Sequence, residues 1–282
     1  MFGYLCGEAR VRGEQRCIWN FYNFIARHHI GRGNQKVFFD IKYLYELFPQ
    51  IISSLPITLS IVVVSTIGGL ILGLIIAYFR IERIPLLNWL GALYVSFVQG
   101  TPIIVQLFVV YYGAPAVLDL AGINVADVSK ISFMFIAYGL NSAAYFSEII
   151  RAAINDIPKT QFDAAYSVGM NKYQAYRKII IPQATKAMAP NVEVSVVSLL
   201  QNSSLATYLG IMDIMGKSQL VGTNTGHQME AYIDAMVIFM VLSLAVHYLF
   251  RYFGLTKRHI KFRLYNVRPL AETNELSFKK VK

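Results

Sequence analysis

The sequence contains a stretch without a single charged residue that runs from residue 47 to residue 79. A helix needs about 20 apolar residues to cross the hydrocarbon core of a bilayer, so this stretch is longer than one crossing requires. We expect the crossing to begin near Ile51, with Pro56 in its outer turn, where a missing backbone N–H does no harm. The composition agrees, because 55% of the residues are hydrophobic and only 15% are charged, against about a quarter in soluble domains. The chain is therefore expected to be an integral membrane protein.

Four further stretches are long and apolar enough to cross a membrane as helices. The first of them lies inside a charge-free segment from residue 84 to residue 118. Together the five stretches predict an all-α, polytopic membrane protein with five transmembrane helices, whose termini lie on opposite sides of the membrane. The four further spans are expected at residues 88–112, 131–154, 192–210 and 231–253.

The positions of the basic residues predict the orientation of the chain, because short cytoplasmic loops are enriched in Lys and Arg. If the C-terminus is cytoplasmic, the inner side holds Arg80, Arg83, six basic residues between 151 and 186, and nine between 251 and 282. The outer loops then hold only Lys130 and Lys217. We therefore expect a multi-pass plasma-membrane protein with its N-terminus outside and its C-terminus in the cytoplasm. The net charge of +10 indicates contact with membrane lipid and no nucleic-acid partner.

The N-terminal segment does not follow this charge rule. Residues 1–46 carry seven basic residues although the expected topology puts them outside, and residues 1–37 contain both cysteines, Cys6 and Cys17, and no apolar span. We expect residues 1–37 to be disordered or to precede the true start, with Val37 as a candidate initiation site; a genuine but poorly ordered tail is the alternative. The expected organisation is then this tail, a transmembrane domain at 38–255 and a basic cytoplasmic tail at 256–282.

The segment 161–183, QFDAAYSVGMNKYQAYRKIIIPQ, mixes charged and apolar residues between the third and fourth expected spans. Thr160 is a candidate N-cap, with Asp163 in the acidic position of a capping box, and Gly169 is a stop signal. Asn171 and Gln174 have the spacing of a second capping box, and that helix is expected to end at Pro182. The segment therefore predicts two short cytoplasmic helices joined by a glycine turn.

Both short helices are expected to be amphipathic, because their apolar residues recur at intervals of three or four. Such an element can rest on lipid headgroups or dock into a groove of a partner protein, and the spacing does not distinguish the two. The expected apolar faces consist of Phe162, Ala165 and Val168 on the first helix and Tyr173, Tyr176 and Ile180 on the second; the polar residues are Lys172, Arg177 and Lys178.

The same segment closely resembles the EAA loop of ABC-transporter permease subunits, whose pattern is E-A-A-x3-G-x9-I-x-L-P. The matching residues are Asp163, Ala164, Ala165, Gly169, Ile179, Ile181 and Pro182, with Asp163 in place of Glu and Ile181 in place of Leu. Three other segments are similar to the polar amino-acid uptake branch of that family: GTPIIVQLFVVYYGAP at 100–115, NSAAYFSEIIRAAINDIP at 141–158 and NSSLATYLGI at 202–211. The resemblance extends over residues 48–255.

This resemblance implies a fold, a set of partners and a mechanism. The EAA loop would form coupling helices that dock on a cytoplasmic ABC ATPase dimer. A second permease subunit, identical or homologous, would complete the path, and an extracytoplasmic substrate-binding protein would deliver an amino acid. ATP would be used by the partner ATPase, which would drive alternating access in the bacterial cytoplasmic membrane, and this chain would bind no cofactor of its own.

No pattern in the sequence predicts catalysis or a metal site. The segment from Gly210 to Ser218 resembles a phosphate-binding loop, but five residues separate its glycines where that loop has four. The five histidines lack the spacing of a zinc site. We therefore expect a non-catalytic membrane subunit without a bound metal.

Polar side chains within the spans are candidates for a solute pathway, because they are costly at membrane depth. Uncharged helix packing and an ordinary proline kink at Pro102 are the alternatives. The candidates are Gln99, Thr101 and Gln106 in the second span, Asn141, Ser142 and Tyr145 in the third, and Gln201, Asn202, Ser203 and Ser204 in the fourth.

Glu148 is the only acidic residue near the interior of a span. It lies close to the inner end of the third span, where it can pair with Arg151 three residues on or contact a substrate. The neutral Gln201 and Asn202 favour cystine or another uncharged polar amino acid as substrate, and a basic amino acid, for which Glu148 would matter more, is the rival. A self-sufficient channel or secondary transporter is the alternative function, although no inverted repeat is visible.

Overall fold

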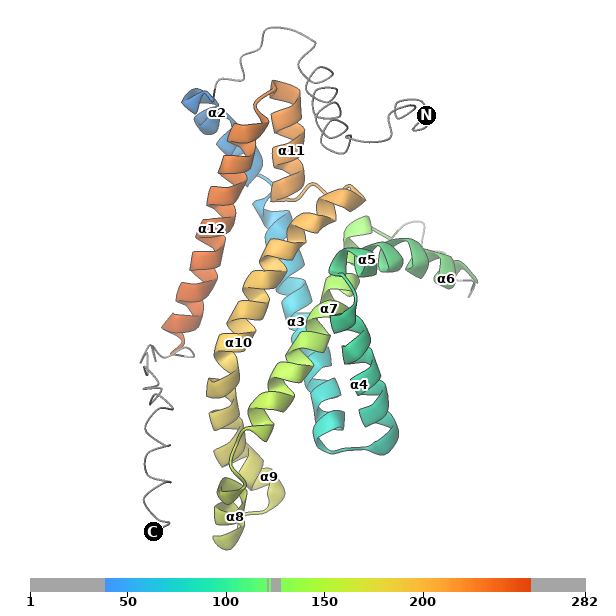
Figure 1. Cartoon of the computed structure of the whole chain (residues 1–282), viewed down its shortest axis with the longest axis vertical. Helices are drawn as coiled ribbons and strands as arrows, with labels where there is room; N and C mark the ends of the chain where they lie inside the picture. Colours follow the sequence, from blue (N-terminus) through green and yellow to red (C-terminus); the bar gives the residue numbers. More distant parts are fainter. Residues whose placement is uncertain (1–38, 121, 123–127, 255–282) are drawn as a thin grey trace, which may run out of the picture.

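The computed structural model describes residues 39–120, 122 and 128–254. The tails expected at 1–37 and 256–282, with Cys6 and Cys17, lie outside the described residues. Within the described ranges every regular element is helical, which confirms the all-α class. Five long helices run along the length of an elongated molecule, and successive ones alternate in direction (Figure 1). They are α3 (Leu55–Ile81), α4 (Pro85–Gly100), α7 (Lys130–Asn155), α10 (Ile181–Asn202) and α12 (Gln228–Tyr252).

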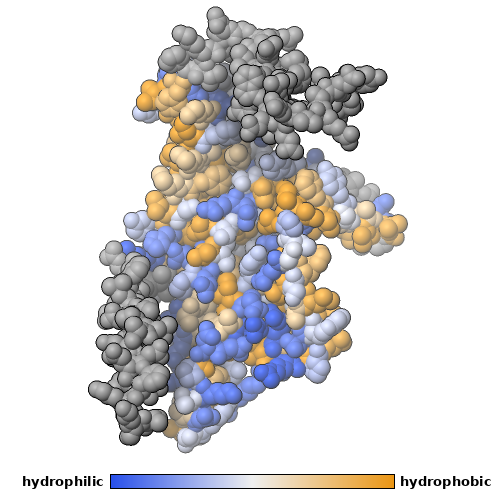
Figure 2. Space-filling model, viewed as in Figure 1, coloured by the Kyte–Doolittle hydropathy of each residue, from blue (hydrophilic) through white to orange (hydrophobic). Residues whose placement is uncertain are grey.

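Shorter helices connect these five. They are α2 (Ile41–Ile52), α5 (Ile103–Phe108), η1 (Val109–Gly113), α6 (Ala114–Leu120), α8 (Lys159–Ser167), α9 (Lys172–Ala175), η2 (Tyr176–Ile180), η3 (Ser203–Leu209) and α11 (Ile214–Thr225). On the face shown in Figure 2, hydrophilic residues gather in the lower part of the molecule, toward α8 and α9.

In the part of the chain that the structure describes, three helical stretches are long and apolar enough to cross a membrane: Leu55–Ile81, Ile103–Leu120 and Gln228–Tyr252. The five expected spans therefore remain a prediction for the other helices. The α7 helix has 26 residues and α10 has 22, but both contain charged residues, and α4 has 16 residues.

Three of the expected spans differ from the helices that the structure contains at those positions. The first long helix begins at Leu55, because α2 ends at Ile52 and a short turn separates the two helices. The second expected span is two helices, because Thr101 and Pro102 have extended backbones between α4 and α5. Proline disfavours a helical conformation in the residue before it, and it has no N–H with which to continue the helix. The fourth begins earlier, at Ile181, and its regular α-helix ends at Asn202.

The closest helix pair is α3 and α7, and a stripe of small residues on α3 allows this close approach. Ser65, Gly69, Gly73 and Ala77 recur every four residues and are all buried. A Cβ added at Gly69 would lie 2.6 Å from the Cβ of Ser142, and one at Gly73 would lie 2.9 Å from the Cβ of Phe146. Small residues at this spacing are typical of membrane helices whose backbones pack closely. The stripe therefore joins α3 and α7 into one body.

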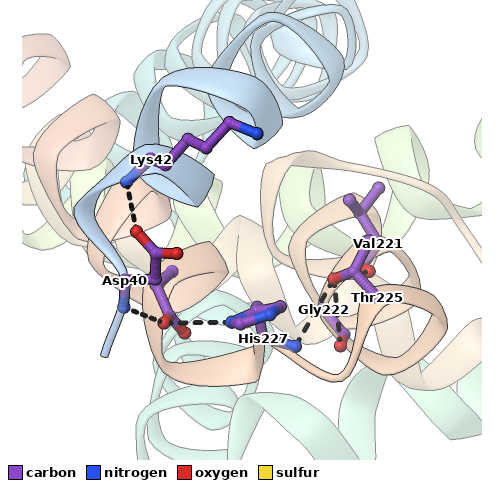
Figure 3. Close-up of polar contacts among 7 residues, drawn as sticks. Asp40, Lys42, Val221, Gly222, Thr225 and His227 are labelled. Carbon is purple, nitrogen blue, oxygen red and sulfur yellow. Dashed lines mark hydrogen bonds and ion pairs between the residues drawn. The ribbon is translucent and has the colours of Figure 1, made fainter. Parts of the chain in front are cut away.

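At the opposite end from α8 and α9, polar contacts attach α2 to the hairpin of α11 and α12 (Figure 3). The backbone N–H of Asp40 donates to Oε1 of Glu230 at 3.0 Å, and Nδ1 of His227 lies 3.1 Å from the same oxygen. The ring of Tyr43 stacks on that of His227 with 3.6 Å between centroids. Asp40 also caps α2 by accepting from the N–H of Lys42 at 3.0 Å.

Candidate functional site

A cavity of about 480 Å³ lies where the break between α4 and α5 meets α7 and α10. Five of the residues predicted for a solute pathway line it: Thr101, Asn141, Ser142, Tyr145 and Asn202. The other lining residues are Pro102, Ile103, Val194, Ser195, Ser198 and Leu199. None of these described lining residues carries a formal charge, so the cavity offers a ligand only uncharged hydrogen-bonding groups and apolar contacts.

Gln106 lies behind the lining and organises the broken helix. Its Nε2 is 2.8 Å from the carbonyl oxygen of Val98, 3.0 Å from that of Thr101 and 2.8 Å from Oγ1 of Thr101. The helix break leaves the two carbonyl oxygens without the backbone N–H partners of a regular helix, and a buried carbonyl without a hydrogen bond is costly. The Oε1 of Gln106 accepts from Nδ2 of Asn141 at 2.9 Å. Gln106 therefore fixes the orientation of Asn141, which lines the cavity.

The α10 helix contributes two residues that sequence reasoning missed. Ser195 and Ser198 line the cavity together with Asn202. Intervals of three and four place these three residues on one face of a helix. Both serines lie inside the expected span at 192–210, and counting back from Asn202 at helical intervals would have found them.

The remaining members of that cluster, Gln201 of α10 and Ser203 and Ser204 of η3, do not line this cavity. Gln201 lines a separate cavity with Met236, Met240 and Ser243 of α12. Ser203 is fully buried and donates to the carbonyl of Leu200 at 2.7 Å. Gln99, in α4, and Ser204 are also absent from the lining of the cavity, and Ser204 donates to the carbonyl of Gln201 at 2.7 Å.

Glu148 lies outside the cavity, between two arginines. Its Oε2 is 2.6 Å from Nη1 of Arg80 and accepts from Nε of Arg151 at 3.2 Å. The predicted pairing with Arg151 is confirmed, whereas the contribution of Arg80 was missed because it comes from α3. Because Arg80 and Arg151 balance its charge, the Glu148 carboxylate attracts a cationic ligand only weakly.

The loop between α7 and α10 contains the two predicted short helices, with changes at their ends. Gly169 has φ +78°, so it supplies the left-handed residue that ends α8, and Asn171 and Gln174 form the predicted capping box. The predicted cap at Thr160 is wrong, since α8 begins at Lys159 directly after Pro158. Pro182 does not end the second helix: a π-helical turn precedes it, and the helical run continues from Lys172 to Asn202. Such a turn changes the hydrogen-bonding register just before the proline.

The loop rests on the end of α7 by only part of its expected apolar face. Ala165 and Ile180 are buried, and the ring of Phe162 packs edge-on against that of Tyr176 with 5.7 Å between centroids. In contrast, Val168 is 71% exposed and Tyr173 is 69% exposed, so this part of the apolar face is open to lipid or to a partner. They lie on the turn between the helices and at the start of the second, beyond the reach of α7.

The outer surface of the loop combines these apolar groups with an unpaired acid. Asp163 and Ala164 are exposed, and no described residue forms a hydrogen bond or ion pair with the Asp163 carboxylate. Lys172 is paired with Glu82, whose carboxylate raises the pKa of the Lys172 ammonium above its usual value. An exposed apolar patch with a free carboxylate beside it is typical of a surface that contacts another protein.

Comparison with known proteins shows which protein family the chain belongs to. Residues 69–258 match the family described as binding-protein-dependent transport system inner membrane component. The chain belongs to this family. It is thus a multi-pass membrane transport subunit and not itself an enzyme. The lining of the cavity and the loop at 159–182 both fall within the matched residues.

Individual members of the family match most of the chain. The L-cystine transport system permease protein TcyL of Bacillus subtilis (strain 168) is 38% identical over 213 residues, which are 76% of this chain and 89% of that protein. The arginine transport system permease protein ArtQ of the same strain is 36% identical over 201 residues, 71% of this chain and 89% of that protein. A crystal structure of an amino acid ABC transporter with histidines has a TM-score of 0.68 and 30% identity, covering 77% of this chain and 98% of that one.

Proposed function

We propose that this protein is the permease subunit of an ATP-driven importer whose substrate is a polar amino acid without a net side-chain charge. The observation that carries the proposal is the cavity beside the α4–α5 break, which lies in a membrane transport subunit and is lined by neutral polar groups. Its volume, about 480 Å³, falls in the range of about 300–1,000 Å³ that is usual for small-ligand sites.

The proposed topology has five transmembrane helices, an external N-terminus and a cytoplasmic C-terminus. The alternating directions of α3, α4, α7, α10 and α12 support it, because they bring the C-terminal end of α3 and the loop at 159–182 to one end of the molecule (Figure 1). The last turn of α3 contains Arg80. The positive-inside rule makes that end cytoplasmic.

The proposed assembly pairs this chain with a second permease subunit, a cytoplasmic ATPase dimer and an external substrate-binding protein. The loop at 159–182 is the docking element for the ATPase, since it exposes Val168, Tyr173 and the unpaired Asp163. Alternating access would arise when the ATPases displace this loop and the continuous helix from Lys172 to Asn202 carries the motion to the cavity.

The identities to TcyL and ArtQ are too close to choose between cystine and arginine as substrate, so the choice rests on charge. A cation would find no carboxylate in the cavity lining, and Glu148 is already bridged by Arg80 and Arg151. Burying an unpaired charge is strongly unfavourable. L-cystine is therefore the first candidate, and uptake of labelled L-cystine and L-arginine into cells with and without the gene tests it. Gene-dependent uptake of arginine alone would contradict the substrate class.

Replacing Asn202 by aspartate should shift this preference toward a cationic substrate. The added carboxylate would face the cavity and favour an arginine side chain, so we expect the uptake ratio of L-arginine to L-cystine to rise by about tenfold or more, as about 1.4 kcal/mol of selectivity would give. Gln201→Glu is the matched control, because this neighbour faces α12 and should leave the ratio unchanged. An equal shift in both variants would argue against the cavity as the recognition site.

A self-sufficient channel or secondary transporter is the alternative function. It predicts uptake without an ATPase, driven by an ion gradient. Reconstitution of the purified chain with and without a co-expressed ATPase separates the two, because ATP-dependent uptake only in the complete assembly supports the importer.

A further inference from the structure

A groove of about 590 Å³ separates the C-terminal end of α3 from the helical run that begins with α9. Leu74 and Tyr78 of α3 line one side, and Tyr176, Thr185 and Met188 line the other. Apart from Glu82, Lys172 and Thr185, the described lining residues are apolar or aromatic. Apolar contacts are non-directional, so a charged pair across the groove adds a directional restraint that they lack.

One ion pair bridges the two sides. Nζ of Lys172 lies 2.8 Å from Oε1 and 2.6 Å from Oε2 of Glu82, and both residues line the groove. The same Nζ lies 5.9 Å from the ring centroid of Tyr176, within the reach of a cation–π contact. The bridge therefore connects the end of α3 with the first residue of α9, across 90 residues of sequence.

Each charge of this pair sits at the less favourable end of its own helix. Glu82 is the C-cap of α3, and Lys172 is the first residue of the run that continues through η2 into α10. Helix dipoles favour cations at the C-terminal end and anions at the N-terminal end, which is the reverse of what is found here. Residues that break a local rule and are satisfied only by a tertiary contact are typical of functional positions.

The bridge joins two parts of the molecule that both contribute residues to the candidate cavity. On one side, α3 is bound to α7 by the small-residue stripe and by Arg80 with Glu148, and α7 supplies Asn141 and Tyr145 to the cavity. On the other side, the run from Lys172 ends at Asn202, which also lines the cavity. A displacement of Lys172 relative to α3 is thus transmitted along a continuous helix to the cavity.

We propose that Glu82 and Lys172 form an ionic strap that sets the width of this groove and passes displacement of the loop at 159–182 to the α3–α7 body. The inference rests on the proposed function for the source of that displacement. The strap itself requires only that the pair restrains the groove, and this can be measured without nucleotide or substrate.

The groove width can be followed by the distance between spin labels at Leu74→Cys and Thr185→Cys in the full chain, with Cys6 and Cys17 replaced by serine. In lipid nanodiscs, Glu82→Gln and Lys172→Gln should each raise the ratio of widened to closed groove by about two- to fivefold, the effect expected of a partly exposed ion pair. The double reversal Glu82→Lys with Lys172→Glu should restore the original distribution, and 1 M salt should act like the single variants.

Glu46→Gln is the matched control, since it breaks an exposed ion pair with Lys42 that is remote from the groove. It should leave the distances unchanged. Unchanged spin-label distances in both Glu82→Gln and Lys172→Gln would overturn the strap. A double-reversal variant whose groove is as wide as in the single variants would also overturn it.

The assembled transporter tests the role of the strap in coupling, with labelled L-cystine as the probe. In proteoliposomes with the ATPase and binding protein, the single variants should retain ATP hydrolysis while the L-cystine moved per ATP falls about two- to fivefold, and the double reversal should recover it. If the ATPase subunit no longer co-purified with the single variants, the pair would be needed for ATPase binding, and this result would contradict a role in transmission. If the wild type moves no L-cystine, the proposed substrate fails, and the nucleotide-free distances still decide the strap.

Discussion

Replacing Gly69 by alanine should destabilise the protein, whereas the same replacement at the adjacent Gly68 should not. The new Cβ at Gly69 would lie 2.6 Å from the Cβ of Ser142 and 3.1 Å from the carbonyl oxygen of Gly139. Because both atoms belong to α7, the two helices must move apart, and overpacking of this kind costs about 1–3 kcal/mol. Thermal unfolding of the detergent-solubilised chain measures the effect. Ser142 lines the cavity, so we also expect substrate uptake to fall.

Gly68→Ala is a sharp control, because it makes the same chemical change one residue away. An added Cβ there would meet no atom within 4 Å, so the variant should be as stable as the wild type or slightly more stable. Equal unfolding temperatures for the two variants would show that α3 and α7 do not approach as closely as the structure places them.

Replacing Asp163 by lysine should disconnect the protein from the proposed ATPase partner without unfolding it. The Asp163 carboxylate is exposed and unpaired among the described residues, so the change removes no internal contact. Loss of a charge that a partner pairs with costs about 2–5 kcal/mol of binding. We therefore expect co-purification of the ATPase and ATP-dependent uptake each to fall by at least about tenfold. Pull-down of the co-expressed ATPase measures the first, and thermal unfolding checks that the chain remains folded.

Two further variants make this result interpretable. Glu46→Lys reverses an exposed acid at the other end of the molecule and should leave ATPase binding intact. Gly169→Val should reproduce the defect by a different route, since a β-branched residue is strained at φ +78° although space is available. If the Asp163→Lys variant bound the ATPase as well as the wild type does, the loop at 159–182 would not be the docking element.

The loop at 159–182 was largely readable from sequence because its signals are local. A capping box and a glycine turn depend on residues within a few positions of each other, so Asn171, Gln174 and Gly169 were interpreted correctly. Two other local signals predicted the helix ends wrongly. Thr160 lies inside α8, which begins at Lys159, and Pro182 lies in the first turn of α10, where a helix tolerates proline.

The cavity was only partly predictable, because it is formed by three separate segments. Thr101, Asn141 and Asn202 could be selected as polar residues at membrane depth. Helical spacing places Asn202 and Gln201 on different faces of α10, but which face meets α7 and the cavity depends on how the helices pack. The role of Gln106, which holds the broken helix and orients Asn141, depends on contacts across 35 residues of sequence.

By itself, the sequence determined that this chain is an all-α membrane protein, which residues could face a polar path, and where a surface loop interrupts the apolar helices. Hydrophobic length, charge placement and capping signals are local properties, and they suffice for these conclusions. The tertiary structure decided which polar residues share one cavity, that Glu148 is bridged by Arg80, and that Glu82 meets Lys172. These outcomes depend on the close approach of α3 and α7, because helix packing sets which side chains of distant segments come within hydrogen-bond distance.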